Sequence, residues 1–178
     1  MINTSVDIND RPSAFRYPRG VGVGMDMPDI TEKLVIGKGR IVKEGKKVAL
    51  LNFGTRLKEC LIAEENLKKK GIDLTVVDAR FAKPLDENLI WQVATNHEVV
   101  ITIEEGAIGG FGSHVNFFLN EKNLLDNNLK FRSMILPDKF IDHNKPEEMY
   151  KDAGLDAKSI ELKVLETLNS KVLIKKIN

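Results

Sequence analysis

The chain has 178 residues, of which 42% are hydrophobic and 30% are charged, the balance of a folded globular protein rather than a disordered one. Its 27 Lys and Arg residues against 26 Asp and Glu residues leave a formal net charge of +1. This balance argues against a nucleic-acid partner, because a protein of that class needs a clear excess of positive charge on one face.

The numbers and spacing of cysteines and histidines argue against disulfide bonds and metal sites. Cys60 is the single cysteine, so neither an intrachain disulfide nor a multi-cysteine zinc site can form. The three histidines are widely spaced and show no metal-ligand spacing. No apolar run approaches the roughly 20 residues that span a bilayer, and residues 1–15 lack the apolar core of a secretion signal. We therefore expect a reduced, cytoplasmic protein with no membrane partner.

The N-terminal part of the chain shows little regular periodicity. We expect residues 1–12, which are polar, to be loose. Residues 13–20 (SAFRYPRG) can hold a short strand that Pro18 stops, because proline cannot donate to a strand ladder. Residues 21–36 contain glycines and Pro28 without a clear period, and we interpret them as a linker.

Strands and helices alternate from Gly37 onward. A short strand over residues 39–44 and an apolar strand over residues 47–53 (KVALLNF) flank a turn, so we expect them to pair as a hairpin that adds an antiparallel edge strand. Thr55 can cap the helix that follows, and Gly71 can close it.

The same alternation continues along the rest of the chain. Asp86 and Asp156 can each start a helix, and another helix follows a glycine-rich turn. Strands are expected over residues 74–78, 99–103 and 131–136, and the first two are expected to be buried. Strands separated by helices of roughly 10–16 residues imply βαβ units. We therefore predict a three-layer α/β/α domain over residues 37–178, with a mixed, mostly parallel sheet of about five strands.

The most informative local stretch is residues 104–113 (EEGAIGGFGS), between a strand and a helix. Its glycines allow close backbone approach, and Ser113 can cap the helix, whose exposed N–H groups can hold an anion. A nucleotide is a poor match, because the order G-x-x-G-G-x-G differs from the dinucleotide fingerprint G-x-G-x-x-G, and no Walker A sequence is present. We favour a tight turn whose glycines serve packing or meet another subunit.

Two carboxylates, Glu104 and Glu105, stand at the end of the strand before that turn. Ligands of α/β sheets lie at the carboxyl ends of strands, so one of the two is a candidate base. Position in a fold is a weak warrant for function, and we favour contacts with a helix dipole or with another domain.

Cysteine and histidine side chains are the other candidates for chemistry. Cys60 falls on the apolar face of its helix, so we expect it in the core rather than as a nucleophile. His97 lies between a helix and a strand, which indicates a turn role. His114 lies beside the glycine-rich turn and His143 in the loop before Pro146, and for both a functional role and a turn role stay open.

Two arginines, Arg16 and Arg19, flank Pro18 and precede a run of glycines. Arginine forks suit phosphate oxygens bidentately. Taken by themselves, however, two arginines in such a segment indicate a solvated pair rather than a binding site.

A series of motifs along nearly the whole chain resembles one known family. The motifs occur in the family's order, at residues 13–20 (SAFRYPRG), 35–39 (VIGKG), 48–54 (VALLNFG), 77–86 (VDARFAKPLD), 102–115 (TIEEGAIGGFGSHV), 136–143 (LPDKFIDH) and 154–157 (GLDA). They are similar to the C-terminal part of 1-deoxy-D-xylulose-5-phosphate synthase, a thiamine-diphosphate enzyme of the transketolase superfamily. Several motifs in one order are more specific than any single motif.

The resemblance implies a reaction and a domain plan. The family joins pyruvate to D-glyceraldehyde 3-phosphate with loss of CO2, and its product feeds isoprenoid precursors by the methylerythritol phosphate route, thiamine and pyridoxal. On this plan residues 1–20 are the tail end of the pyrimidine-binding domain, residues 21–36 are a linker, and residues 37–178 are the transketolase C-terminal domain. Met1 then need not be the biological start.

The resemblance also implies what the chain does not carry. Thiamine diphosphate and Mg in the complete enzyme bind to residues upstream of the matching region, so we expect no catalytic, cofactor-binding or metal-binding residue here and no activity of the chain alone. One role carries over: in the family the second arginine of the RYPRG motif contacts the phosphate of D-glyceraldehyde 3-phosphate, so the resemblance implies this role for Arg19. We expect Arg16 and Tyr17 to shape the strand instead. The expected partners are the upstream domains, on the same or a separate chain, and a second copy in a homodimer.

Other interpretations stay open at this point. The chain can be a non-catalytic dimerisation or docking module. It can also be the C-terminal domain of another thiamine enzyme, such as transketolase or the β chain of a 2-oxo acid dehydrogenase. A free-standing nucleotide binder is the weakest alternative, because no phosphate-binding motif is complete.

Overall fold

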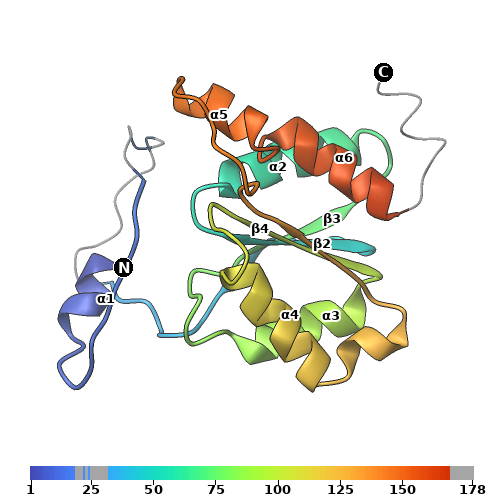
Figure 1. Cartoon of the computed structure of the whole chain (residues 1–178). Helices are drawn as coiled ribbons and strands as arrows, with labels where there is room; N and C mark the ends of the chain where they lie inside the picture. The colour runs from blue at the N-terminus through green and yellow to red at the C-terminus, as the bar shows by residue number, and fades with distance from the viewer. Residues whose placement is uncertain (19–21, 23, 25–31, 169–178) are drawn as a thin grey trace.

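The computed structural model describes residues 1–18, 22, 24 and 32–168 (Figure 1). Most of the linker predicted over residues 21–36, and everything after residue 168, lie outside the described residues. In the described part the elements follow the order α1 (Ile2–Val6), β1 (Arg40–Lys43), β2 (Val48–Phe53), α2 (Leu57–Lys68), β3 (Leu74–Asp78), α3 (Glu87–Asn96), β4 (Val99–Glu104), α4 (Phe111–Glu121), the 3-10 helix η1 (Leu124–Asn127), β5 (Lys130–Met134), α5 (Pro146–Asp152) and α6 (Ala157–Thr167).

A five-stranded sheet in the described part runs in the order β1-β3-β2-β4-β5. β2 is parallel to both β3 and β4, and β5 is parallel to β4. The register sets Leu50 of β2 beside Val76 on one side and Ile101 on the other. Helices cover both faces of these central strands, which is why each reads as a continuous apolar run. The predicted mixed, mostly parallel sheet is confirmed.

The predicted hairpin between the first two strands is wrong. β1 is an antiparallel edge strand as expected, but its partner is β3 rather than β2. Every residue of β2 except the last is fully or nearly fully buried, and both edges of β2 are taken by parallel neighbours, whereas β1 is only half buried. An interior position for the more apolar strand buries more apolar surface, so the chain crosses over after β1.

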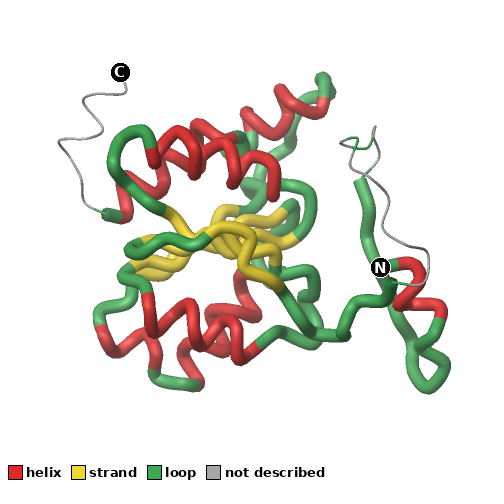
Figure 2. Tube along the Cα trace, turned by 180° about the vertical axis from the view of Figure 1, so that it is seen from behind, coloured by secondary structure: helices red, strands yellow, loops and turns green. Residues whose placement is uncertain are grey.

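Two helix layers enclose the sheet (Figure 1, Figure 2). α2 and α6 cover one face, and α3 and α4 cover the other. Successive residues of β2 point to opposite layers, since Leu50 lies in the core beneath α2 and α6, and Leu51 lies in the core beneath α3 and α4. Both side chains are fully buried, which contributes roughly 1.5–3 kcal/mol for each leucine.

Side-chain caps start two of the predicted helices. Asp86 caps α3 and Asp156 caps α6, each by accepting a hydrogen bond from the backbone N–H three residues on, at 3.3 Å and 3.0 Å. Both predictions are confirmed. The Thr55 cap is wrong, because the N-cap of α2 is Arg56 and the helix starts one residue later than a Thr55 cap requires.

The N-terminal segment differs from expectation in two ways. Residues 2–6, expected to be loose, form the short helix α1, and the buried Thr4 hydroxyl accepts a hydrogen bond of 2.9 Å from the backbone N–H of Leu34. An ion pair between Lys33 and Asp7 joins the same two segments. Residues 13–18 form no strand and take no part in the described sheet, so a segment that could extend lacks the ladder hydrogen bonds that would hold it as a strand.

Two short elements had no prediction. α5 buries none of its residues fully, so it shows no apolar stripe from which a helix could be predicted. η1 is a single short turn between α4 and β5. No helix in the described ranges is long and apolar enough to cross a membrane.

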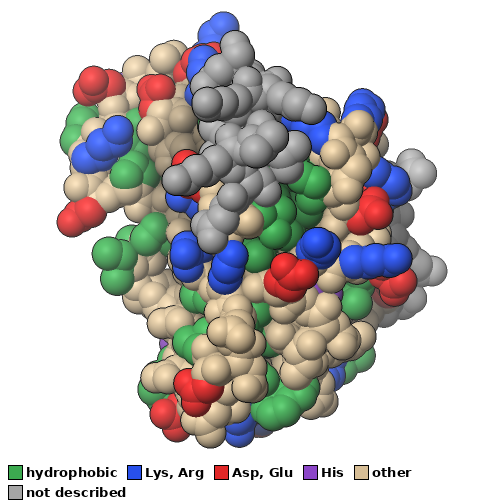
Figure 3. Space-filling model, turned by 90° about the vertical axis from the view of Figure 1, so that its right-hand side faces the viewer, with side chains coloured by type: hydrophobic (Ala, Val, Ile, Leu, Met, Phe, Trp, Pro, Cys, Tyr) green, Lys and Arg blue, Asp and Glu red, His purple; other side chains and the backbone are tan. Residues whose placement is uncertain are grey.

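Charges on the side of the molecule where the parallel strands begin are mixed. Figure 3 shows this side, and over its visible part Lys and Arg side chains are interspersed with Asp and Glu. The mixture agrees with the near-zero net charge, and no extended field of one sign is visible there.

Candidate functional site

The carboxyl ends of β2, β3 and β4 meet at one side of the sheet, which we call the carboxyl edge. It consists of residues 52–56, 78–81 and 104–112, which follow or end these three parallel strands. Figure 1 shows the N-terminal segment on this side of the domain. Ligands of open α/β sheets bind at such edges, so the carboxyl edge is the candidate functional site.

Glu104, the last residue of β4, turns its carboxylate onto the N-terminus of α4. It is 4% exposed and accepts hydrogen bonds from the backbone N–H of Phe111 at 3.0 Å and of Gly112 at 2.7 Å. These N–H groups have no partner within the helix, and the helix dipole favours a negative charge beside them. Glu104 therefore caps α4 from outside the helix, and the interpretation as a helix-dipole contact is confirmed.

The glycines of the turn make room for that carboxylate. A Cβ atom at Gly106 would lie 2.3 Å from Oε2 of Glu104, and one at Gly110 would lie 2.5 Å from the same oxygen. Gly112 is packed against β4 and β5, because a Cβ there would lie 2.6 Å from Oγ1 of Thr102. The glycines serve packing, as the favoured interpretation of the turn requires.

This arrangement fills the position that a bound anion would need. The Glu104 carboxylate already accepts the N–H groups at the start of α4, and its negative charge would repel a phosphate there. Ser113 is not the cap, because the N-cap is Gly110 and the Ser113 hydroxyl accepts a hydrogen bond from the N–H of Gly109 at 2.9 Å. Nucleotide binding at this turn is therefore disfavoured.

Glu105 enters a different cluster, with Arg56 and Tyr150. The Arg56 Nε lies 2.9 Å from Oε1 of Glu105, and both side chains are largely buried. The Arg56 guanidinium also lies over the Tyr150 ring, 3.5 Å from its centroid. A cation stacked on an aromatic face while paired with a carboxylate is held in one orientation. The cluster joins the start of α2, the end of β4 and the helix α5.

Tyr150 has a raised pKa in this cluster. Burial raises the pKa of its phenol, and the hydrogen bond and negative charge of Glu105 raise it further. The phenol therefore stays neutral to a higher pH than a free tyrosine and keeps donating to the carboxylate. Because Glu105 is engaged by both neighbours, the geometry favours the structural role over a base.

Two of the quoted motifs meet at Asp86. Its Oδ1 lies 3.0 Å from Nζ of Lys38, and its Oδ2 accepts a hydrogen bond from the backbone N–H of Gly39 at 3.1 Å. The same carboxylate caps α3. Asp86 thus fixes residues 37–39, where the chain enters the sheet, against the helix that follows β3.

A pair of arginines stands at the end of β3. The Nε of Arg40 lies 3.1 Å from Oδ2 of Asp78, and the Nε of Arg80 lies 3.6 Å from the same oxygen. Arg80 has a positive φ of 58°, which is uncommon for a residue with a side chain. The sequence did not suggest this pair or the Arg56 cluster, because Arg40 and Arg56 each meet a carboxylate from a distant element.

The structure places Cys60 in the core, His97 in a hydrogen-bonded turn, and His114 and His143 on the surface. Cys60 is buried in the core, and burial raises the pKa of its thiol, so the predicted core role is confirmed. His97 is held between Oγ1 of Thr75 at 2.7 Å and the carbonyl of Val93 at 2.8 Å, which agrees with its turn role. His114 and His143 are exposed, and both of their roles stay open.

The arginine predicted to bind phosphate, Arg19, lies outside the described residues. Arg16 and Tyr17 are exposed at the end of the described N-terminal segment, where the rings of Phe15 and Tyr17 lie 6.1 Å apart. The role of Arg19 therefore stays a prediction.

The described residues form neither a metal site nor a pyrophosphate site. No group of three or more His, Cys, Asp or Glu side chains among them is placed to hold a metal ion. A pyrophosphate does not fit the glycine-rich turn, because Glu104 takes its N–H groups.

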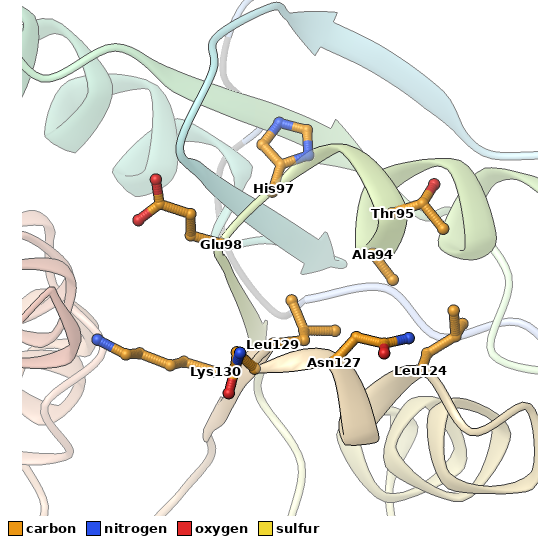
Figure 4. Close-up of a pocket in the computed structure, with 9 residues that line it drawn as sticks. Ala94, Thr95, His97, Glu98, Leu124, Asn127, Leu129 and Lys130 are labelled. Atoms are coloured by element: carbon orange, nitrogen blue, oxygen red, sulfur yellow. The ribbon is translucent and has the colours of Figure 1, made fainter.

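Two cavities formed by described residues lie at the opposite edge of the sheet. One, of about 450 Å³, is formed by the end of α3, η1 and the start of β5 (Figure 4). Figure 4 shows Glu98 and Lys130 extending to the side away from Leu124, so they do not converge on a common point within it. The Lys130 ammonium instead donates to the carbonyl of Thr167 at 3.2 Å, which ties β5 to α6. The cavity lacks the convergent polar groups of a ligand site.

Comparison with known proteins decides the family. Residues 37–160 match the family model described as "Transketolase, C-terminal domain". The chain belongs to this family. The match begins at Gly37, where the alternation of strands and helices begins.

Two solved structures resemble this transketolase C-terminal domain. The first is described as "Split gene transketolase, inactive beta4 tetramer"; it is 28% identical, has a TM-score of 0.71, and aligns over 82% of this chain and 46% of its own. The second, transketolase from Campylobacter jejuni subsp. jejuni NCTC 11168, is 19% identical with a TM-score of 0.53, over 73% of this chain and 18% of its own, and shows the fold alone. The chain thus spans less than half of either relative.

Proposed function

We propose that this transketolase C-terminal domain is part of a 1-deoxy-D-xylulose-5-phosphate synthase. In that enzyme it would work with upstream domains that bind thiamine diphosphate and Mg, and the reaction would join pyruvate to D-glyceraldehyde 3-phosphate with release of CO2. The chain by itself would be inactive, since the described residues fit neither the metal nor the pyrophosphate.

The motif at residues 13–20 (SAFRYPRG) carries the choice of this enzyme within the family. It stands ahead of the domain that begins at residue 37, and it resembles the end of the pyrimidine-binding domain of the synthase. On this proposal residues 1–20 belong to that domain, residues 21–36 link it to the C-terminal domain, and residues 37–178 form the latter. The N-terminal segment lies on the side of the carboxyl edge, which is compatible with a contribution to a site there (Figure 1).

Arg19 is the proposed substrate-binding residue. A guanidinium offers two parallel N–H donors to a phosphate, and such charge-assisted pairs are among the strong hydrogen bonds of proteins. The residues described at the carboxyl edge would shape the site rather than react, because Glu104 and Glu105 are engaged within the domain. We place the complete enzyme in the cytoplasm as a homodimer.

A second candidate is half of a split-gene transketolase. The observation that favours it is the 28% identical relative, whose description names a split gene and a β4 tetramer. On this candidate the chain would be a subunit that becomes active only with a separate partner chain, and the reaction would be ketol transfer between sugar phosphates.

The size of the native polypeptide and the product of its assembly test the proposal. Immunodetection in a source-cell lysate, with an antibody against residues 37–168, shows whether the domain is part of a longer chain. If it is not, the same antibody captures the partner chain. The captured enzyme should form deoxyxylulose phosphate from pyruvate and D-glyceraldehyde 3-phosphate. Ketol transfer without that product would support the second candidate, and capture of the chain without any partner would favour a non-catalytic docking module.

A further inference from the structure

We propose that Arg40 and Arg80 form a binding site for one carboxylate at the carboxyl edge. The site is independent of which enzyme the domain serves, because it rests on residues within the domain alone. It differs from the proposed phosphate contact of Arg19, which lies in another segment.

Convergence of two guanidinium groups on one oxygen defines the site. The Nε atoms of Arg40 and Arg80 both approach Oδ2 of Asp78, at 3.1 Å and 3.6 Å. The contacts of both arginines with described residues are made by Nε, and their terminal nitrogens donate no hydrogen bond to a described residue. Each arginine therefore still offers donors of its fork, and the shared oxygen keeps the two forks close together.

The backbone of Arg80 indicates that its side chain has a use beyond the contact seen within the chain. The φ of Arg80 is 58°, a backbone conformation that glycine adopts without strain and that is unfavourable for an arginine because of its Cβ atom. The contact with Asp78 is 3.6 Å, too long for a hydrogen bond, and partly exposed pairs of this kind contribute little. Strained residues of this kind cluster at ligand sites.

Charge selects the class of ligand. Two guanidinium groups and the single carboxylate of Asp78 leave one uncompensated positive charge. A monoanionic carboxylate neutralises it and matches the planar fork bidentately. A dianionic phosphate would leave an excess negative charge beside Asp78. Lys38, two positions before Arg40 in the chain, is already paired with Asp86.

The carboxylate can come from a small acid or from an Asp or Glu side chain of another protein segment. Both sources present the same carboxylate group to the arginines. The chain spans less than half of either relative, so in an assembled enzyme other segments can supply a side-chain carboxylate. The two arms of the experiment below separate them.

The first arm titrates the isolated 178-residue chain with sodium acetate and follows the arginine Nε–H signals by NMR, with sodium chloride at equal ionic strength as the reference. We expect saturable shifts of the Arg40 and Arg80 signals with acetate and not with chloride. Arg80→Gly removes the guanidinium while relieving the positive φ, so it should fold at least as well and weaken acetate binding about tenfold or more. Arg132→Ala, on the opposite edge strand, is the matched control and should bind acetate like the wild type.

Three outcomes of this arm would overturn the proposal. They are no saturable shift in the wild type, unchanged binding in a folded Arg80→Gly variant, and tighter binding of inorganic phosphate than of acetate. Since no outcome depends on deoxyxylulose phosphate formation, failure here leaves the proposed function standing, and the reverse also holds.

The second arm identifies the source of the carboxylate in the assembled enzyme. Phenylglyoxal modifies accessible arginines, and peptide mass spectrometry reports the modified positions. Protection of Arg40 and Arg80 without added acetate, and modification in the isolated chain, identifies a side-chain carboxylate of another segment. Protection that requires acetate identifies a small acid. Modification of both arginines that acetate does not slow would contradict the site.

Discussion

The carboxylate of Glu104 accepts a hydrogen bond of 2.7 Å from the backbone N–H of Gly112, eight residues further along the chain. A residue that ends a strand thus caps the helix that follows the next turn. The glycines between them are needed because the carboxylate occupies the inside of the turn. The glycine-rich turn is thus folded around the carboxylate of Glu104, which belongs to the same chain.

Replacement of this carboxylate by an amide should destabilise the domain. Glu104→Gln keeps the shape but removes the charge beside the helix N-terminus, and we expect a loss of about 1–3 kcal/mol in the free energy of unfolding, measured by urea denaturation. Glu121→Gln, at the exposed end of the same helix, is the control and should change stability by less than about 0.5 kcal/mol. Equal effects of the two changes would refute the capping role.

The close approach of Gly110 to the same carboxylate makes a separate prediction. A Cβ at Gly110 would lie 2.5 Å from Oε2 of Glu104, so Gly110→Ala should cost about 1–3 kcal/mol. If the cost arises from this clash, the double variant with Glu104→Ala should lose clearly less than the sum of the single variants. Gly22→Ala, where a Cβ meets nothing within 4 Å, should be neutral. Additive effects would contradict the clash.

Tyr150 should make stability depend on alkaline pH. Its pKa is raised in the folded chain, so above a pH of about 10 the unfolded state loses a proton that the folded state keeps. The stability that this proton contributes is present below the unfolded pKa and is lost as the pH rises through the folded pKa. A Tyr17→Phe variant leaves Tyr150 as the single tyrosine, and its absorbance titration should have a higher midpoint in buffer than in denaturant. Coincident midpoints would show that the cluster with Arg56 and Glu105 does not form.

Cys60 should be inert in the folded chain. Burial raises the pKa of its thiol and blocks access, so labelling with iodoacetamide at pH 8 should be at least about a hundredfold slower in buffer than in urea. Rapid labelling in buffer would place Cys60 outside the core. The result also tests the packing of α2 on the sheet, since Cys60 lies in that layer.

Local patterns in the sequence predicted those strands and helices whose formation depends on their own residues. The buried strands are runs of β-branched and aliphatic residues, and Asp86 and Asp156 begin helices by binding their own backbone. The hairpin failed because the order of strands depends on competition between β1 and β2 for an interior place, which no local pattern expresses. Among the candidate residues, the roles of Glu104 and Cys60 could be predicted from their positions beside a helix N-terminus and on an apolar face.

The clusters of the carboxyl edge could not be predicted in the same way. Arg56 meets Glu105, which is 49 positions away, and Tyr150, which lies on a helix without an apolar stripe. The convergence of Arg40 and Arg80 on Asp78 depends on the antiparallel pairing of β1 with β3, the very pairing that the sequence did not indicate. Such contacts depend on the order and pairing of the strands, which the local sequence patterns do not determine.

The most direct test of the proposed function is a product assay of the assembled enzyme with pyruvate and D-glyceraldehyde 3-phosphate. We expect deoxyxylulose phosphate and CO2 in equal amounts, and we expect Arg19→Ala to raise the KM for D-glyceraldehyde 3-phosphate at least about tenfold while the KM for pyruvate changes little. The isolated chain should give no product. Ketol transfer between sugar phosphates in place of this product, or an Arg19→Ala enzyme with unchanged KM values, would contradict the account.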